Sequence, residues 1–346
     1  MKNNLLLILS VTAFSLTACN SAGTATSTTT GIYAYIADFS GNALQKCVVA
    51  SDGTLSFCQN IAQPGTLNNP TGIAINNGQI YVNNSAFTVP SSVPSSYTQC
   101  LLNNSMTTLS GCSINTQPGL QYPIGITISG NYSYIGNYFA TESYARPGTY
   151  TLCNVESNTG SLINCQTNQI ENIPADGTPE VVVINNNFGY ITDQTNSGYM
   201  FCNVSTESGS LNSCQFESLE SGIGGVIPIG PRGMMINNGY AYIVNSGVVN
   251  NAIIGASSYT VCSVNPERGT LTNCSTQETS PGKLNSPTGI AVYESNVYIT
   301  NEDGPGYSYT MCGIGLNGFL TNCSTYSLSG ATTQTGPWLT YIAFGQ

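Results

Sequence analysis

The 346-residue sequence contains no histidine. Histidine supplies the base in Ser-His-Asp and Cys-His catalysis, ligates zinc and haem, and shuttles protons near neutral pH, so these kinds of site are excluded. Charged residues make up only 6% of the chain, and the formal net charge is −10. Because an acidic surface with few cations repels phosphate groups, nucleic acid is not expected as a partner.

Long hydrophobic runs are also lacking, and the apolar segment at residues 5–16 is too short to cross a membrane as a helix. It follows Lys2 and ends in the residues LTAC, which is the form of a signal peptide. LTAC resembles the lipobox of bacterial lipoproteins, which implies a signal peptide over residues 1–18 and lipidation of Cys19. Asn20 then implies sorting to the bacterial outer membrane, facing the periplasm or the cell surface. An ordinary signal peptide that leaves Cys19 as a free thiol is the alternative.

The residues after the signal peptide divide into a short linker and one long domain. Residues 19–31 hold Cys19 and a run of small polar residues, so we expect a flexible tether there. Residues 32–346 are too many for an ordinary single core. A domain of this size is expected to be a barrel, a propeller or a solenoid.

The thirteen cysteines are regularly spaced. Without Cys19, twelve remain, and they fall into six local pairs, which favours disulfides and an oxidising compartment. Redox-active or metal-binding thiols are the alternative, but they need closer spacing or a positively charged surrounding. The expected pairs are Cys47–Cys58, Cys100–Cys112, Cys153–Cys165, Cys202–Cys214, Cys262–Cys274 and Cys312–Cys323.

Each cysteine pair belongs to a repeat of about fifty residues. The segment YTVCSVNPERGTLTNC (259–274) recurs in similar form, and most copies follow a second segment of the type PTGIAINNGQIYVNN (70–84). Each unit holds four short runs of β-branched and aromatic residues separated by Gly and Asn turns, which predicts four antiparallel strands. Four strands per repeat of this length are typical of a propeller blade.

The two ends of the domain complement each other. GIYAYIAD (31–38) matches the second strand of the repeat and lacks the first, whereas PWLTYIAFG (337–345) matches the first strand alone. Together they make one complete blade, which closes the ring without an open edge. The sequence therefore predicts an all-β, six-bladed propeller in which the C-terminal strand pairs with the three N-terminal strands.

The repeat pattern P-x-G-I-A-I…Y-I-T-N resembles the YVTN and NHL families of β-propeller repeats over residues 31–345. The resemblance implies the fold and leaves the function open, because such propellers include hydrolases, lyases and binding modules.

The cysteine spacings also predict the hairpin turns. A spacing of 11 predicts two-residue loops, at Asp52-Gly53 and Asn317-Gly318. A spacing of 12 predicts three-residue loops that end in Gly, as at 158–160, 207–209 and 267–269. Residues 105–107 lack Gly and are expected to form the least regular turn.

Two sets of residues are candidates for a site at one mouth of the channel. The first follows the second strand of each blade, and its six side-chain oxygens could hold Ca²⁺ or carbohydrate hydroxyls, although Asn and Asp in such places commonly serve the turn itself. The members of this Asn/Asp ring are Asp38, Asn84, Asn137, Asp193, Asn245 and Asn301.

The second set follows the proline of the first strand, and there the blades differ. Its expected members are Thr71, Ile124, Glu180, Arg232, Thr288 and Trp338, the only tryptophan. Charged residues near the channel of so uncharged a protein favour a ligand contact. A salt bridge between Glu180 and Arg232, with Trp338 as a plug, is the alternative.

Two enzymes with related folds provide a test of catalysis. In gluconolactonase-like propellers, metal-binding Asn and Asp precede the Gly of the first strand, and here those positions hold no Asn or Asp, so only Glu180 could ligate a metal. Streptogramin B lyases use a catalytic His, which this chain lacks. We therefore expect no cofactor and no catalysis.

The sequence favours a monomeric binding module for a protein or carbohydrate partner, attached to the membrane only through its lipid. Long loops after the second strands, at 85–96, 138–149 and 246–258, are expected to set its specificity. Nearby tyrosines suit contacts with sugars or proteins: Tyr97, Tyr138, Tyr144, Tyr150 and Tyr259. A metal-assisted hydrolase or lactonase centred on Glu180 is the alternative.

Overall fold

The computed structural model describes residues 31–61, 65–85, 94–102, 109–117, 119–138, 148–219, 226–249, 252–278, 283–302, 308–328 and 339–345. These residues belong to one compact unit, Gly31–Gln346. The predicted signal peptide, Cys19, the tether and Trp338 lie outside the described residues. Within these ranges no helix is long and apolar enough to cross a membrane.

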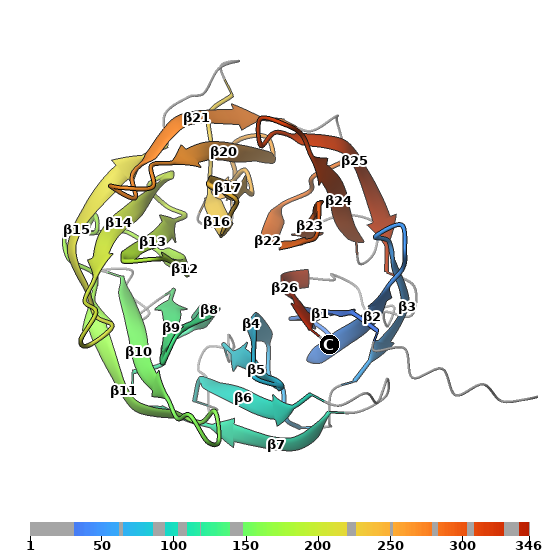
Figure 1. The fold of residues 1–346 in the computed structure, drawn as a ribbon, viewed down its shortest axis with the longest axis vertical. Coiled ribbons are helices and arrows are strands. Elements are labelled where there is room, and N and C mark those ends of the chain that lie inside the picture. The colour runs from blue at the N-terminus through green and yellow to red at the C-terminus, as the bar shows by residue number, and fades with distance from the viewer. Residues whose placement is uncertain are drawn as a thin grey trace, which may run out of the picture. The chain divides into compact units, whose positions relative to one another are not determined.

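The described residues of this unit form six four-stranded antiparallel sheets arranged around an axis, and the prediction of a six-bladed propeller is confirmed (Figure 1). The blades are numbered in chain order, and the strands of each blade are given from the innermost outwards. Blade one is β26 (Leu339–Gly345), β1 (Tyr33–Asp38), β2 (Ala43–Val49) and β3 (Leu55–Asn60). Blade two is β4 (Pro70–Asn76), β5 (Gln79–Asn84), β6 (Ser96–Leu101) and β7 (Ser110–Asn115). Blade three is β8 (Pro123–Ser129), β9 (Tyr132–Asn137), β10 (Thr149–Val155) and β11 (Leu162–Gln169).

The other three blades repeat this order. Blade four is β12 (Pro179–Asn185), β13 (Phe188–Asp193), β14 (Gly198–Val204) and β15 (Leu211–Ser218). Blade five is β16 (Pro231–Asn237), β17 (Tyr240–Asn245), β20 (Ser258–Val264) and β21 (Leu271–Gln277), with a small extra hairpin of β18 (Val248–Val249) and β19 (Ala252–Ile253). Blade six is β22 (Pro287–Tyr293), β23 (Asn296–Asn301), β24 (Ser308–Ile314) and β25 (Leu320–Ser327).

The ring closes where β26 pairs with β1, as the sequence predicts. Asp38 is paired with Leu339, whereas in blade two the corresponding Asn84 is paired with Pro70. Leu339 is therefore the counterpart of Pro70, and Thr340 is the counterpart of Thr71. The prediction that Trp338 occupies the Thr71 position is wrong by two residues, because the pairing of Ile342 with Ile36 sets the register of the closing strand.

All six predicted disulfides are present, one in each blade. Their Cα atoms are 4.0–4.1 Å apart, closer than the spacing of about 4.5–5.5 Å for ordinary opposed residues. The cause is a β-bulge beside each pair, which places one extra residue on the outermost strand. These extra residues have φ between 49° and 58°: Phe57, Gly111, Asn164, Ser213, Asn273 and Asn322.

The bulge makes each described turn one residue longer than predicted. In blade one, Ala50 N donates to Thr54 O, which leaves a three-residue loop. In blade three, Glu156 N donates to Ser161 O, which leaves a four-residue loop. The predicted loop lengths were wrong because the shift of register lies inside the strand, where the turn sequence gives no sign of it. Residues 105–107 lie outside the described ranges.

Buried tyrosines connect the disulfide hairpins of blades one and four to the preceding blade. Tyr298 Oη donates to Gly53 O at 2.7 Å, and Tyr134 Oη donates to Gly209 O at 2.8 Å. On the neighbouring strand, Tyr150 Oη accepts from Leu211 N at 2.9 Å. Tyr97, Tyr150 and Tyr259 are at most 2% exposed, so the prediction that they contact a ligand is wrong. Tyr144 lies outside the described residues.

The core lies between the blades. Apolar side chains on the facing surfaces of two sheets form each cluster, as where Tyr242 and Val244 of blade five pack with Val297 and Ile299 of blade six. Each sheet has a neighbouring blade on both of its faces, so side chains on both faces are buried. This explains why all residues after the first are buried in strands such as β5 and β17.

Candidate functional site

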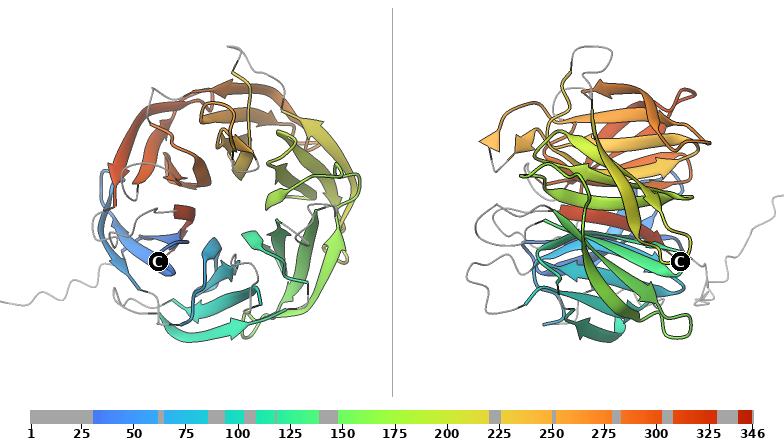
Figure 2. Two further views of the ribbon diagram at one scale, coloured as in Figure 1. Left: turned by 180° about the vertical axis from the view of Figure 1, so that it is seen from behind. Right: turned by 90° about the vertical axis from the view of Figure 1, so that its left-hand side faces the viewer.

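The propeller has two different faces. The mouth face carries the residues that begin the innermost strands, such as Pro70 and Pro231, and those that end the second strands, such as Asn84. The hairpin face carries the turn glycines of the disulfide hairpins, Gly53 and Gly160 among them. In the side view of Figure 2, the small arrows of β18 and β19 project beyond the blades at the mouth face.

Three threonines near the mouth connect adjacent innermost strands. Thr71 Oγ1 donates to Pro123 O at 2.7 Å, Thr288 Oγ1 donates to Leu339 O at 2.7 Å, and Thr340 Oγ1 donates to Thr71 O at 2.8 Å. Thr71 and Thr288 are 2–3% exposed. Two of the predicted binding residues are thus buried and hydrogen-bonded to the next blade.

Neighbouring innermost strands lie closest together at the residue after Thr71 and its counterparts in the other blades. Four strands have glycine there, and a Cβ at Gly72, for example, would overlap the carbonyl oxygen of Ile124 in the next blade. Blade four has Val181 instead, and blade one has Tyr341. Tyr341 packs in the same cluster as Val181 and Met234, which belong to blades four and five across the ring. Tyr341 therefore plugs the channel, which is the role that the sequence suggested for Trp338.

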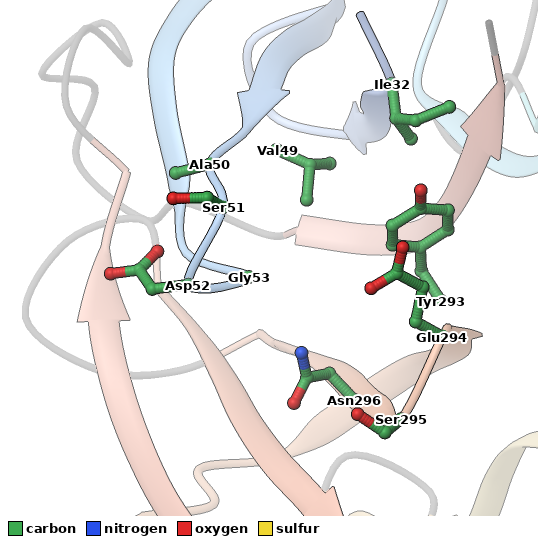
Figure 3. Close-up of a pocket in the computed structure, with 10 residues that line it drawn as sticks. All are labelled: Ile32, Val49, Ala50, Ser51, Asp52, Gly53, Tyr293, Glu294, Ser295 and Asn296. Atoms are coloured by element: carbon green, nitrogen blue, oxygen red, sulfur yellow. The ribbon is translucent and has the colours of Figure 1, made fainter.

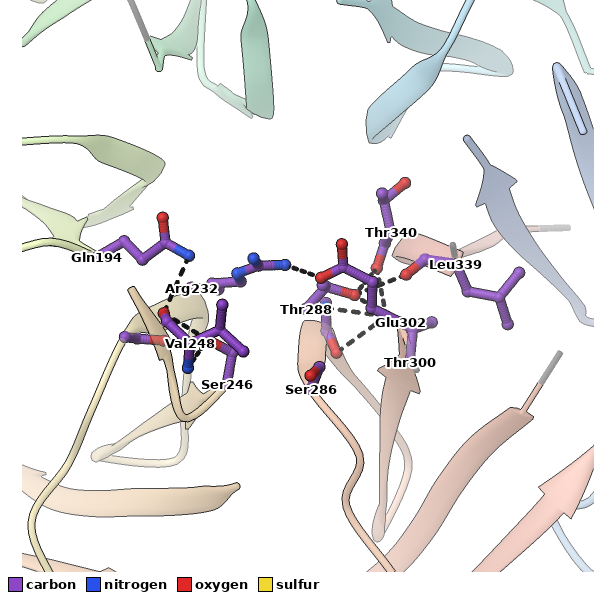
Figure 4. Close-up of polar contacts among 12 residues, drawn as sticks. Gln194, Arg232, Ser246, Val248, Ser286, Thr288, Thr300, Glu302, Leu339 and Thr340 are labelled. Atoms are coloured by element: carbon purple, nitrogen blue, oxygen red, sulfur yellow. Dashed lines mark hydrogen bonds and ion pairs between the residues drawn. The ribbon is translucent and has the colours of Figure 1, made fainter. Parts of the chain in front are cut away.

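The two predicted charged residues do not pair with each other among the described residues. Arg232 Nη1 forms an ion pair with Glu302 Oε2, from the end of β23 (Figure 4). The alternative prediction of a Glu180–Arg232 salt bridge is therefore wrong. Glu302 was missed because it follows β23 in another blade and no spacing in the sequence links it to Arg232.

Gln194 and Tyr138 complete the surroundings of Arg232. Figure 4 shows the Gln194 amide nitrogen directed at Val248 O, 3.4 Å away, while its oxygen accepts from Tyr138 Oη at 2.8 Å. If the amide is flipped, so that its oxygen and nitrogen exchange places, the oxygen accepts from Arg232 Nε and Nη2 at 2.9 and 3.0 Å, and the nitrogen donates to Tyr138 Oη. The flipped orientation satisfies both neighbours, so we assign it to Gln194.

Glu180 is 5% exposed and lies within electrostatic reach of Arg232. Burial raises the pKa of Glu180 to about 7; the Arg232 charge opposes this shift, and Glu302 and Asp193 add to it. Burial also raises the pKa of Tyr341 well above its usual value, and no described residue hydrogen-bonds to its hydroxyl. The channel thus holds a carboxyl group and a phenol beside a guanidinium that is already paired.

The Asn/Asp ring supports the turns of its own blades. Asn84 Nδ2 donates to Thr98 Oγ1 at 2.9 Å, and Asn84 Oδ1 accepts from Asn68 N at 3.1 Å. Matching bonds from the amide nitrogen to a threonine hydroxyl are made by Asn137, Asn245 and Asn301. Asp193 accepts from Thr178 N at 3.0 Å, and Asp38 accepts from Gly41 N at 2.9 Å. Within the described residues, no group of three or more His, Cys, Asp or Glu side chains is placed to hold a metal ion.

The hairpin of β18 and β19, with Ile254 and the adjoining Ile227, exposes apolar side chains at the mouth face. Ile253 is 80% exposed, Ile227 is 62% exposed and Ile254 is 59% exposed. We call these three residues the blade-five patch. Gly247 N donates to Ile229 O at 2.9 Å, which joins the hairpin to the segment of Ile227. The sequence signal was the apolar pairs Val248-Val249 and Ile253-Ile254 in a loop expected to be polar.

Comparisons with known proteins support the fold. No protein-family model and no curated protein matches the chain. A putative 6-phosphogluconolactonase from Bacteroides fragilis has a TM-score of 0.61 and 12% identity, covering 92% of this chain and 99% of its own. The periplasmic gluconolactonase PpgL of Pseudomonas aeruginosa has a TM-score of 0.59 and 14% identity, covering 90% and 99%. A chain of a nidogen/laminin complex has a TM-score of 0.59 and 11% identity, covering 91% and 98%. At such identities the likeness extends to the β-propeller fold alone.

Proposed function

We propose that this protein is a lipid-anchored, non-catalytic propeller of the bacterial cell envelope that binds a protein partner through the mouth face of blade five. The observation that carries the proposal is the blade-five patch, in which Ile253 is 80% exposed on a projecting hairpin. Exposed apolar side chains that gather beside charged and polar groups are typical of protein interaction surfaces. Here Val248 of the hairpin lies beside Gln194, whose amide oxygen accepts from Arg232 Nε and Nη2.

The form of the hairpin favours an extended segment of the partner. β18 and β19 pair only with each other within the described residues. Val248 N and O of β18 already bond to Ser246 Oγ, so we assign the added strand to the outer edge of β19. An isolated two-stranded hairpin is marginally stable in water, and a third strand would stabilise it. We therefore assign an extended protein segment, rather than a glycan, to this surface.

β1 begins at the face opposite the blade-five patch. Tyr33, at the start of β1, is paired with Gly345, and Asp38, at its end, reaches the mouth face. The propeller thus begins at the hairpin face. Lipidation at Cys19 would therefore attach the propeller through the face opposite the blade-five patch.

Site-specific photo-crosslinking in intact cells tests this function. A photo-reactive amino acid at position 253 is expected to give a discrete adduct with one protein, whereas the same residue at the fully exposed Leu316 of the hairpin face is the control. Ile254→Asp, with the crosslinker kept at position 253, should reduce the adduct about tenfold, because it removes the burial of one apolar side chain. Equal adducts at both positions, or a glycan in place of a protein, would contradict the proposal.

A lactonase is the second candidate, and the Glu180 carboxyl is the observation that favours it. A pKa of about 7 suits a general base at neutral pH. Turnover of glucono-δ-lactone should then fall by about 100-fold or more in Glu180→Gln. Turnover and melting temperature should also respond to Ca²⁺ and to EDTA. If chelation changes neither turnover nor melting temperature, and Glu180→Gln hydrolyses the lactone at the same rate as wild type, the lactonase is excluded.

A further inference from the structure

The junction between blades six and one differs from the other junctions in how the turn glycine is covered. At each described junction, the first residue of the second strand lies over the turn glycine of the next blade. Tyr132, Phe188 and Tyr240 place an aromatic ring there, over Gly209, Gly269 and Gly318. At the junction of blades two and three, Gln79 and Gln99 both bond to Thr159 O beside Gly160. Over Gly53 the residue at this position is Asn296, whose amide is shorter than the aromatic and Gln side chains of the other junctions, and Met311 Sδ lies beside it.

Two further residues of the same turn depart from the repeat. The last residue of the innermost strand is Asn or Ser in blades two to five and Tyr293 in blade six. In blades two to five the next residue has positive φ and is Asn77, Gly130, Asn186 or Asn238, whereas in blade six it is Glu294, with φ 53°. Asn and Gly adopt this conformation readily, whereas Glu does so at a cost of about 1–2 kcal/mol. A strained residue of this kind commonly marks a functional position.

The three residues line a cleft of about 340 Å³ between blades six and one. Figure 3 shows the Glu294 carboxylate and the Tyr293 ring on one side, with Ile32 and Val49 above them and the Asn296 amide reaching in from blade six below. Asp52 lies at the rim, where its carboxylate accepts from Thr54 N at 2.9 Å and Thr54 Oγ1 at 2.7 Å. Tyr293 is fixed in place by stacking on Phe344, with ring centroids 5.3 Å apart.

We propose that this cleft binds an alkylammonium or alkylguanidinium group, with Glu294 as its charge partner and the Tyr293 ring beside its alkyl chain. The volume suits a small ligand or one long side chain. The ten residues that line the cleft include two carboxylates and no Lys or Arg, so a cation is favoured over an anion. Charge-assisted hydrogen bonds to a carboxylate and contact with an aromatic ring are the interactions by which proteins select such cations.

Calorimetric titration of the full-length protein with agmatine, at low ionic strength, tests the proposal. We expect one saturable site per chain, weakened by added salt, and no binding of the uncharged analogue 1,4-butanediol. Asn296→Tyr restores the aromatic residue found in blades three and five, and it should abolish binding without loss of melting temperature. Glu294→Asn restores the turn residue of blades four and five, and it should weaken binding about tenfold or more.

Glu267→Gln is the matched control, because Glu267 is an exposed acid on the blade-five hairpin of the same face and should not affect the affinity. Equal binding of agmatine and 1,4-butanediol, unchanged affinity in Asn296→Tyr, or no binding of agmatine to wild type would each overturn the proposal. A blocked Gly-Arg-Gly peptide separates two sources of the cation. Affinity equal to that of agmatine assigns the site to an arginine of another protein, whereas a tenfold preference for agmatine assigns it to a free small molecule. This site is on the face opposite the blade-five patch, so either result is independent of the crosslinking outcome.

Discussion

Glu180 is a buried acid whose ionisation the fold disfavours. Its pKa is raised from 4.5 to about 7, chiefly by burial. Because the folded state holds the proton more tightly than the unfolded state does, stability falls as pH rises from about 4.5 to about 7. Below this window the protonated carboxyl carries no such penalty, and above it the full penalty applies.

Replacing Glu180 should therefore change the pH dependence of stability. We expect Glu180→Gln to gain stability relative to wild type between pH 4 and pH 8, by up to about 3 kcal/mol for a shift of about 2.5 pKa units. Urea unfolding at both pH values measures this gain. Asp52→Asn is the control of opposite sign, because hydrogen bonds from Thr54 lower the pKa of Asp52, and its stabilising effect is lost as pH falls. A gain that is independent of pH would contradict the assignment.

At the residue scale, the sequence predicted where the blades differ but not what the differing residues contact. Glu180 and Arg232 were identified because they interrupt a repeat of uncharged residues. The partner of Arg232 is Glu302, which comes from the loop after β23 and is brought close only by the ring. Tyr341 was missed for the same reason, because its contacts lie across the channel from its own blade.

At the element scale, each disulfide hairpin depends on one residue with a left-handed backbone. Five of these bulge residues are Gly, Asn or Ser, which adopt positive φ at low or moderate cost, but blade one has Phe57, with φ 49° and 75% exposure. The exposed ring contributes little burial to offset the backbone strain. Blade one therefore has the least favourable residue at this position.

Exchanging this residue between blades should change stability in opposite directions. We expect Phe57→Asn to stabilise the protein by about 1 kcal/mol, and Asn164→Phe at the equivalent position of blade three to destabilise it by a similar amount. The midpoint of urea unfolding measures both changes, with unchanged m-values. A loss of stability in Phe57→Asn would show that the ring makes contacts that matter more than its backbone.

The hairpins also show why strand pairing was predicted better than turn length. The cysteine pairs follow from local spacing, and all six were correct. The turn lengths required knowledge of a bulge, which depends on the twist of the outer strands and not on the turn residues. The tyrosines were misread because nothing local distinguishes a tyrosine that bonds to the next blade from one that faces solvent.

At the scale of the whole molecule, the ring depends on β26 to cover the edge of β1. Removing residues 339–346 would expose the backbone hydrogen-bonding groups of β1, which then become available to another chain. We expect this variant to self-associate, whereas the intact chain, which we propose to be a monomer, should not. Size-exclusion chromatography with light scattering measures the difference.

Replacement of residues 248–253 by a Gly-Ser linker is the control for that truncation. It removes β18 and β19, which pair only with each other in the described part of the chain, and it should leave the protein monomeric. A monomeric truncation with the melting temperature of the intact chain would refute the closing role of β26. The number of blades could be predicted from the sequence repeats alone. The register of β26 could not, because it is set by the pairing of Ile342 with Ile36 in the folded ring.

The antiparallel pairing of β1 with β26 determines how the ring would respond to mechanical force. Tyr33 lies opposite Gly345, so the first and last strands of the propeller emerge side by side at the hairpin face. Tension between these two ends would break the hydrogen bonds between β1 and β26 one at a time. Strands pulled apart in this way separate at a lower force than strands pulled along their length, where all the bonds share the load. The blades would then come apart in series, and each disulfide would keep the segment between its cysteines, which are 11 or 12 positions apart, from extending. The pairing of β1 with β26 is thus the part of the ring that opens first under force, and the disulfide hairpins are the parts that resist longest.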